Sequence, residues 1–90
     1  MKTLEDVNKF IEDLGYEEVV VFSNPDYASA FLGVSSNNCA VYSYVGMVQH
    51  LMEVDGMEEE EARDFIDYNT LGALGRDGDP IVLMDEVLPE

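Results

Sequence analysis

The sequence SAFLGVSSNNCAVYSY, residues 29–44, decides the fold that we predict for this chain. Two apolar runs, Ser29–Val34 and Cys39–Tyr44, are separated by the polar residues 35–38. Two such runs joined by a short polar segment are typical of a β-hairpin. Gly33 lies inside the first run, where an isolated glycine indicates a β-bulge or a close approach of the backbone.

The hairpin lies within a part of the sequence that has no charged side chains. From Tyr27 through Met52, 26 consecutive residues include no Asp, Glu, Lys or Arg, although the chain has 20 acidic residues. One interpretation is a central hairpin that is buried under helices. The other is an uncharged edge or face that pairs with a second copy of the chain or with a partner protein. The sequence leaves both interpretations open.

Before the hairpin, the sequence predicts one helix and one strand. Thr3 and Asp6 have the spacing of a capping box, and the apolar residues that follow recur at helical spacing. We therefore expect a helix over residues 4–14, ended by Gly15. Glu18–Phe22, EVVVF, is too short for a helix and is rich in β-branched residues, so we expect a buried strand there.

After the hairpin, the sequence predicts two helices and a last strand. Ser43 is a suitable N-cap for a helix that Gly56 ends. The second helix begins near Glu58 and fades between residues 69 and 74, and Ile81–Met84 is a short apolar run that predicts a strand. The residues expected to form the apolar stripe of the first of these helices are Met47, Val48, Leu51, Met52 and Val54.

The predicted order of elements is α-β-β-β-α-α-β, in a single domain that comprises residues 1–90. Such an order favours an α+β fold. We expect one mostly antiparallel four-stranded sheet, with the helices packed mainly on one of its faces. We also expect the last strand to lie beside the first, since both are short, apolar and typical of buried strands.

The net charge excludes several functions. Four Lys and Arg residues stand against twenty Asp and Glu residues, which gives a formal net charge of −16. Nucleic acid and anionic membranes are bound by cationic groups, so neither is an expected ligand, and a charged partner should be basic. The sequence has no apolar run of membrane-spanning length, no signal-peptide core, and a single cysteine, Cys39. We therefore expect a cytoplasmic protein without an internal disulfide.

Few residues offer catalytic or metal-binding chemistry. Cys39 and His50 are the candidates for a nucleophile and its base, but we expect Cys39 in the core and His50 at the surface. One His and one Cys do not make an ordinary zinc site. Residues 77–79, DGD, begin like a calcium-binding loop, but the later ligand positions are apolar. We therefore expect no enzymatic activity, no cofactor and no metal.

The candidate binding residues are carboxylates near the last predicted helix. Glu53–Asp67, EVDGMEEEEARDFID, has eight carboxylates in fifteen residues and one cation, Arg63. Arg63 is four residues from an acid on either side, so we expect it to be paired locally. On a helical wheel Glu60, Asp64 and Asp67 share one side. The residues that we predict to bind a partner are Glu58, Glu59, Glu60, Glu61, Asp64 and Asp67.

This acidic surface has two interpretations. It can be a solvated helix surface that keeps the protein soluble, or soluble at high internal salt. Alternatively, its carboxylates mimic the phosphates of nucleic acid and occupy the cationic groove of a nucleic-acid-binding protein. Small acidic proteins of phages and mobile elements that block restriction or CRISPR effectors act in this second way, and this chain is similar to them in size and charge.

Several short segments carry a second resemblance. They are Asn24–Tyr27, Ala30–Val34, Tyr44, Met47–Val48, Gly56–Met57, Glu60–Ala62, Phe65–Ile66 and Tyr68–Thr70. Over residues 16–85 the chain resembles a family of small uncharacterised proteins from phages and mobile elements of gram-positive gut bacteria. Members of that family have an arginine in place of Gly72 and a proline near Gly75, so the end of the last helix departs from the pattern. The resemblance implies a mobile-element origin but no site residues.

Taken together, the sequence predicts a non-enzymatic phage or mobile-element protein that inhibits a basic nucleic-acid-binding partner through its acidic helix. The alternative is a small interaction module that self-associates, as a homodimer, through the uncharged residues 27–52.

Overall fold

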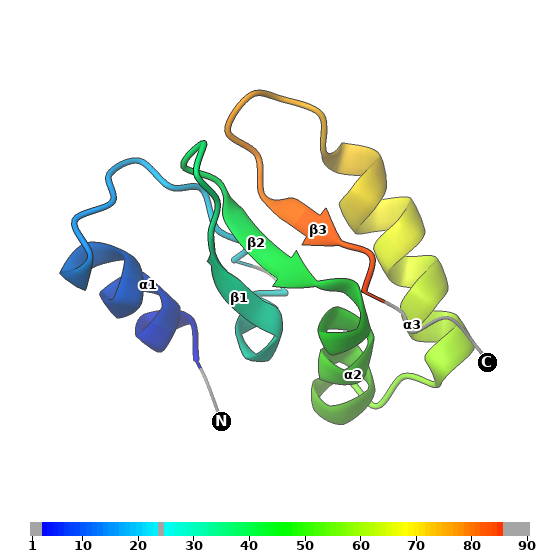
Figure 1. The fold of residues 1–90 in the computed structure, drawn as a ribbon. Coiled ribbons are helices and arrows are strands. Elements are labelled where there is room, and N and C mark those ends of the chain that lie inside the picture. Colours follow the sequence, from blue (N-terminus) through cyan, green and yellow to red (C-terminus); the bar gives the residue numbers. More distant parts are fainter. Residues whose placement is uncertain (1–2, 24, 86–90) are drawn as a thin grey trace.

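The computed structural model describes residues 3–23 and 25–85 and has an α+β fold (Figure 1), as the sequence predicts. Its α-helices are α1 (Leu4–Asp13), α2 (Tyr44–Val54) and α3 (Glu59–Phe65). Its strands are β1 (Phe31–Val34), β2 (Ala40–Ser43) and β3 (Ile81–Leu83). Two short 3₁₀ helices, η1 (Ala28–Ala30) and η3 (Leu71–Ala73), and one π-helix, η2 (Ile66–Thr70), complete the described elements.

The sheet differs from the prediction in both size and topology. Among the described residues it has three strands in the order β1-β2-β3, with β1 and β2 antiparallel and β2 and β3 parallel. The predicted four-stranded, mostly antiparallel sheet is therefore wrong. A parallel pair needs a crossover connection, and α2 and α3, which lie between β2 and β3 in the chain, supply it. The expectation that the last strand lies beside the first is also wrong, because the predicted first strand, residues 18–22, does not form and β3 pairs with β2.

The segment Glu18–Phe22, predicted as a strand, is irregular in the structure. Glu18 has a φ of 57°, which interrupts an extended chain. The segment is fixed through side chains instead. The backbone N–H of Phe22 donates to the hydroxyl of Tyr42 at 3.2 Å, and the Phe22 ring centroid lies 4.7 Å from that of Tyr42 and 5.3 Å from that of Tyr27. Val19, Val21 and Phe22 thus pack against the core as partly buried residues, and the segment does not extend the sheet.

The predicted hairpin is confirmed. β1 and β2 pair with Phe31 opposite Tyr42, and the backbone N–H of Ser35 donates to the Cys39 carbonyl at 2.8 Å across the loop. The register shifts between Phe31 and Gly33, so the predicted bulge at Gly33 is also present.

The predicted helix caps are confirmed. Thr3 and Asp6 form a capping box, with distances of 3.2 Å from the Asp6 N–H to the Thr3 hydroxyl and 3.0 Å from the Thr3 N–H to the Asp6 carboxylate. The Ser43 hydroxyl caps α2 by accepting a backbone N–H of its first turn at 2.9 Å. The apolar stripe of α2 is narrower than predicted, because Met52 and Val54 remain 39% and 56% exposed.

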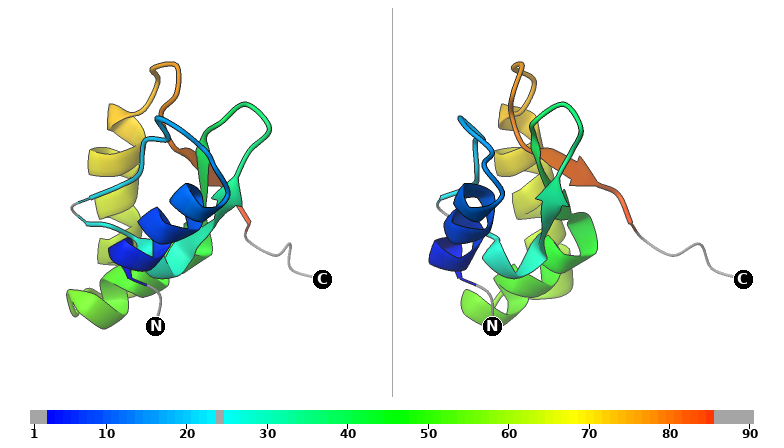
Figure 2. Two further views of the ribbon diagram at one scale, coloured as in Figure 1. Left: turned by 90° about the vertical axis from the view of Figure 1, so that its left-hand side faces the viewer. Right: turned by 60° about the vertical axis from the view of Figure 1, so that its left-hand side comes forward.

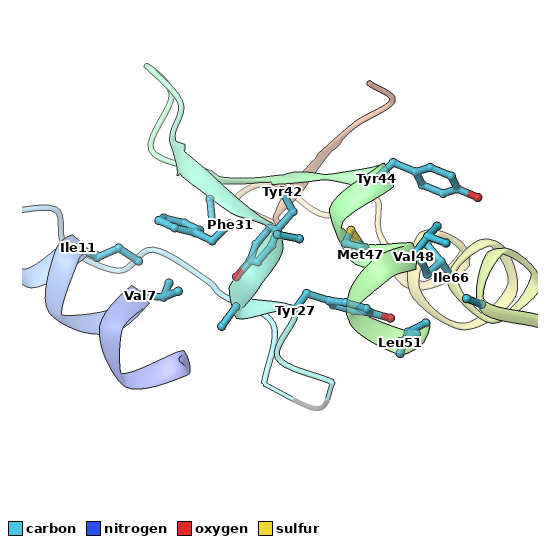
Figure 3. Close-up of a cluster of buried hydrophobic side chains, with 14 residues drawn as sticks. Val7, Ile11, Tyr27, Phe31, Tyr42, Tyr44, Met47, Val48, Leu51 and Ile66 are labelled. Carbon is cyan, nitrogen blue, oxygen red and sulfur yellow. The ribbon is translucent and has the colours of Figure 1, made fainter. Parts of the chain in front are cut away.

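The core joins one face of the sheet to α1 and α2 (Figure 3). Tyr42 of β2 and Tyr27, which precedes η1, are fully buried, as are Met47 and Leu51 of α2. Phe31 of β1 packs edge-on against Tyr42, with ring centroids 5.6 Å apart. Burial raises the pKa of the Tyr27 and Tyr42 hydroxyls, so both phenols stay neutral well above physiological pH.

The opposite face of the sheet is open to solvent. Figure 2 shows α1 and α3 on the same side of the sheet. On the other side, Leu32 of β1 and Leu83 of β3 remain 55% and 50% exposed, and Ile81 of β3 is paired with the half-buried Val41 of β2. We call Leu32, Val41, Ile81 and Leu83 the outer sheet face. It is apolar and uncharged, so part of the uncharged hairpin is buried and part faces solvent.

Candidate functional site

The acidic helix begins where the chain turns sharply after α2. Gly56 has a φ of 69°, in the left-handed region that glycine adopts without strain. The carbonyl of Glu58, the N-cap of α3, accepts the backbone N–H of Ala62 at 2.8 Å. Glu59, Glu60 and Glu61 follow in the first turn, where carboxylates interact favourably with the positive end of the helix dipole.

The helix presents nearly all of its surface to solvent. Ala62 is the residue of α3 that is fully buried, and Phe65 is half-buried. All six carboxylates predicted from the sequence are exposed. We call this group the acidic surface; it consists of Glu58, Glu59, Glu60, Glu61, Asp64 and Asp67.

The cation within the acidic surface is engaged by its neighbours. The Nε of Arg63 lies 3.8 Å from a carboxylate oxygen of Glu59, and its guanidinium lies 5.6 Å from the ring centroid of Tyr44. The local pairing predicted for Arg63 is thus confirmed on the Glu59 side. Tyr44 in turn donates its hydroxyl proton to Asp67 at 3.2 Å. Burial and then the charge of Asp67 raise the pKa of Tyr44, which therefore remains a donor at neutral pH.

The regular α-helix ends earlier than a helical wheel assumes. After Phe65 the chain continues as the π-helix η2, in which the backbone N–H of Leu71 donates to the carbonyl of Ile66. The 3.6-residue period therefore does not extend to Asp67, whose carboxylate contacts Tyr44 of α2. Glu60 and Asp64 lie within the regular part of α3 and keep their spacing of four residues.

His50 occupies a different environment from the predicted one. It was expected at the surface, but it is only 8% exposed. Its Nδ1 lies 3.1 Å from the hydroxyl oxygen of Ser29, and its Nε2 lies 3.7 Å from a carboxylate oxygen of Asp26. The sequence reasoning missed Ser29 and Asp26, because both are more than 20 residues from His50 in the chain and neither belongs to a spacing pattern.

Cys39 and the loop at residues 77–79, which were considered as a nucleophile and a calcium site, both have structural roles. Cys39 is 5% exposed, a small core residue as predicted. In the loop that begins like a calcium site, the Asp79 carboxylate accepts the backbone N–H groups of Gly75 and Arg76 at 3.2 Å and 2.9 Å. Within residues 3–23 and 25–85, no three His, Cys, Asp or Glu side chains are grouped closely enough to hold a metal ion.

The chain matches no protein-family model, no curated protein sequence and no solved structure. The resemblance to phage and mobile-element proteins therefore stays a prediction from the sequence. In the described part of the chain, no helix is long and apolar enough to cross a membrane. The fold and the site together define a small α+β protein with an exposed acidic helix.

Proposed function

We propose that this chain is an inhibitor, from a phage or mobile element, that blocks a basic nucleic-acid-binding protein by binding to it and not by a catalytic step. In this proposal the acidic surface occupies the cationic groove that normally receives phosphates. A host restriction or CRISPR effector in the cytosol is the kind of target that this chemistry fits. The inhibitor acts by occupying the groove, and it requires no cofactor.

The observation that carries the proposal is the exposure of the acidic surface together with the engagement of its cation. Six carboxylates face solvent, whereas Arg63 is held between Glu59 and the ring of Tyr44. Glu60 and Asp64 point their charge into solvent without an ion pair to any described residue. Such a surface attracts cations over about a Debye length, about 8–10 Å at physiological salt.

The density of charge is comparable to that of nucleic acid. Residues 58–67 span about 13 Å at a rise of about 1.5 Å per residue, so their six carboxylates average one per roughly 2.2 Å. Duplex DNA carries one charge per about 1.7 Å of its axis when both strands are counted. A groove that binds a duplex through lysine and arginine would therefore meet a similar, slightly weaker field.

The decisive experiment reverses charge at the centre of the acidic surface. The variant Glu60→Lys with Asp64→Lys should lose binding to a basic target, while its circular dichroism stays that of the parent. Candidate targets are captured from host lysate at low salt, eluted in a salt gradient, and tested for competition with duplex DNA or guide RNA. Binding should weaken steeply with salt and be displaced by the nucleic acid.

The matched control reverses the same number of charges elsewhere. Glu53 of α2 and Asp77 of the loop before β3 are both exposed acids outside the acidic surface. The variant Glu53→Lys with Asp77→Lys has the same net charge as the test variant and should retain most of the binding. If both variants lose binding equally, the interaction depends on net charge alone, and if the test variant retains it, the proposal is wrong.

A second candidate function is self-association through the outer sheet face. The observation that favours it is the exposure of Leu32 and Leu83 on a face without charged residues in its strands. Because each copy carries a charge of −16, a homodimer should strengthen as salt screens the repulsion. Sedimentation at about 0.1 M and about 1 M salt tests this. A monomer under both conditions would exclude it, and Leu32→Asp should dissociate a dimer if one forms.

A further inference from the structure

A second cluster of reactive side chains lies where η1 packs against α2, away from the residues of the acidic surface. The two elements approach closely because residue 46 is a glycine. A Cβ on Gly46 would lie 2.9 Å from the Cβ of Ala30 in η1, which is too close for any real side chain. His50 follows Gly46 by one helical turn, so the same close approach brings the imidazole to Ser29 of η1.

The cluster consists of a nucleophile, a base and a carboxylate in contact, which are Ser29, His50 and Asp26. The Ser29 hydroxyl oxygen is 3.1 Å from Nδ1 of His50, within hydrogen-bond distance. On the other side of the ring, Nε2 is 3.7 Å from a carboxylate oxygen of Asp26, a distance of charge interaction. A tautomer with its proton on Nε2 satisfies both contacts, because Nδ1 then accepts the serine proton while the ring N–H faces the carboxylate.

The three residues differ in exposure as nucleophilic catalysis requires, with an accessible nucleophile and a buried base. Ser29 is exposed, so an electrophile can reach its hydroxyl. The side chain of His50 is 9% exposed and that of Asp26 is 32% exposed. Asp26 is also held in place, because the same carboxylate oxygen accepts the backbone N–H of Ala28 at 3.0 Å. The base and its orienting carboxylate are therefore fixed, and the nucleophile faces solvent.

The backbone of this turn is strained. Tyr27, between Asp26 and η1, has φ 46° and ψ 29°, in the left-handed region, although it carries a fully buried aromatic side chain. Such strain persists only where the surrounding structure enforces it, and it is concentrated at functional sites. The Tyr27 ring also packs against His50, with centroids 5.6 Å apart. Other nucleophilic serines are exposed on strained turns; here the strained residue, Tyr27, precedes Ser29 by two positions and packs on its base.

The backbone also provides a donor beside the nucleophile. The first amides of a 3₁₀ turn have no partner within the turn, and in η1 Asp26 takes that of Ala28 while the Tyr27 carbonyl takes that of Ala30 at 2.8 Å. Among the described residues, the N–H of Ser29 itself has no acceptor. It is placed to donate to an oxyanion that forms on a carbonyl attacked by the Ser29 hydroxyl.

We propose that Ser29, His50 and Asp26 form an acyl-transfer site, with neutral or cationic activated esters as its substrates. The net charge of −16 repels anionic esters. The Ser29 oxygen attacks the ester carbonyl, its proton passes to Nδ1 of His50, and the alcohol leaves with that proton. Water then attacks the acylated serine through the same base and releases the acid. This site is independent of the acidic surface and goes beyond the proposed inhibition.

The first test converts the nucleophile to one whose reactivity is easily measured. In a Ser29→Cys variant, alkylation by iodoacetamide should be at least about 10-fold faster than in Ser36→Cys, whose cysteine stands on the exposed hairpin loop without a base. The native Cys39 is buried in both proteins. Both substitutions are nearly isosteric and at exposed positions, so folding is preserved. Equal alkylation rates at positions 29 and 36 would overturn the proposal.

The second test uses the natural chain and a fluorophosphonate probe, with the modified residue identified by mass spectrometry. Labelling should fall on Ser29, disappear in Ser29→Ala, persist in Ser36→Ala and slow by about 100-fold in His50→Gln. No labelling of the native chain, or labelling at an unchanged rate in a folded His50→Gln protein, would contradict the assignment.

Asp26 is a positioning residue, so its variant needs a readout that folding alone does not change. Asp26→Asn keeps an oxygen for the Ala28 N–H but removes the charge beside the imidazole. The rate of Ser29 labelling should fall about 10-fold in Asp26→Asn and be partly regained in Asp26→Glu, which restores a carboxylate beside the imidazole. Labelling of a folded Asp26→Asn protein at the rate of the parent would remove Asp26 from the site.

Discussion

The consecutive helices α2 and α3 differ in how much of their surface packs against the rest of the fold. α2 has eleven residues, of which five are buried, and a serine side chain caps its first turn. α3 has seven residues, of which one is buried, and no side chain caps it. α2 is therefore specified by packing against the sheet and η1. α3 has little packing of its own and is held mainly by the segments before and after it, so most of its side chains face solvent.

The difference shows how a small chain can carry so much negative charge. α3 is held at its buried residue Ala62, and the π-helix η2 that continues it is held at Ile66 and Thr70. The Thr70 hydroxyl is hydrogen-bonded to that of Tyr27 at 3.0 Å. The carboxylates of the acidic surface, which precede these anchors or lie between them, stay exposed to water, so their repulsion is screened by water and salt. If the comparison is correct, substitutions in α2 should change stability by several kcal/mol, and substitutions in the acidic surface by a fraction of that.

The largest effect is expected at Leu51 of α2. Leu51 is fully buried, so Leu51→Ala should lower the free energy of unfolding by about 2–5 kcal/mol through lost burial and a residual cavity. Its neighbour Met52 is 39% exposed, and Met52→Ala should cost under about 1 kcal/mol. Urea denaturation followed by circular dichroism measures both. Equal losses would mean that α2 does not form the core as described.

An intermediate effect is expected at the N-terminus of α2, where Asp85 ties the chain after β3 to the helix. The Asp85 carboxylate accepts the Ser43 hydroxyl proton at 2.5 Å and the Val45 N–H at 3.1 Å. The Ser43 hydrogen bond, followed by backbone N–H groups, lowers the pKa of Asp85. Asp85→Asn should therefore cost about 1 kcal/mol at neutral pH.

The stabilisation by Asp85 should depend on pH, and the direction follows from its lowered pKa. Because the pKa of Asp85 is lower in the folded chain than in the unfolded chain, its contribution is complete above the unfolded value of about 4. The contribution is lost as the pH falls toward and through the folded pKa. The stability difference between the parent and Asp85→Asn should thus shrink steadily below about pH 4. A difference that stayed constant down to acid pH would assign the effect to packing.

The sequence predicted local structure well and long-range structure poorly. The capping box at Thr3, the bulge at Gly33 and the Ser43 cap all depend on neighbouring residues, and all are confirmed. The strand predicted at Glu18–Phe22 has strong β propensity, but the segment is irregular and is fixed by the packing of Phe22 on Tyr27 and Tyr42. The prediction of a buried strand is therefore wrong in both respects, since the segment pairs with no strand and Val19, Val21 and Phe22 are only partly buried while Val20 is 48% exposed.

The candidate sites show the same limit. The exposure of the acidic surface could be predicted, because charge and helical spacing are local properties of the sequence. The contact of His50 with Ser29 and Asp26 could not, because it depends on the close approach of Gly46 to Ala30 and on the left-handed backbone of Tyr27. Both are set by the packing of η1 on α2, which no local pattern records.

The smallest effects on stability are expected within α3. Two substitutions there should change stability in opposite directions, which tests whether α3 is governed by charge and not by packing. Asp64 follows Glu60 by four residues and Glu61 by three, so Asp64→Asn should relieve repulsion and raise stability by about 0.2–0.5 kcal/mol. Glu59→Gln should lower stability by a similar amount, because Glu59 interacts with both Arg63 and the helix dipole. Thermal unfolding at low salt should resolve the two opposite shifts.

Salt separates these charge effects from any change in helix propensity. At about 1 M salt the Debye length falls to about 3 Å, so both shifts should become smaller while a propensity difference would persist. A loss of stability in Asp64→Asn at low salt would mean that its carboxylate has a stabilising partner in the folded chain. In that case Asp64 would join Glu59 and Asp67 as a carboxylate with a partner inside the chain, and fewer carboxylates of the acidic surface would be free to bind another protein.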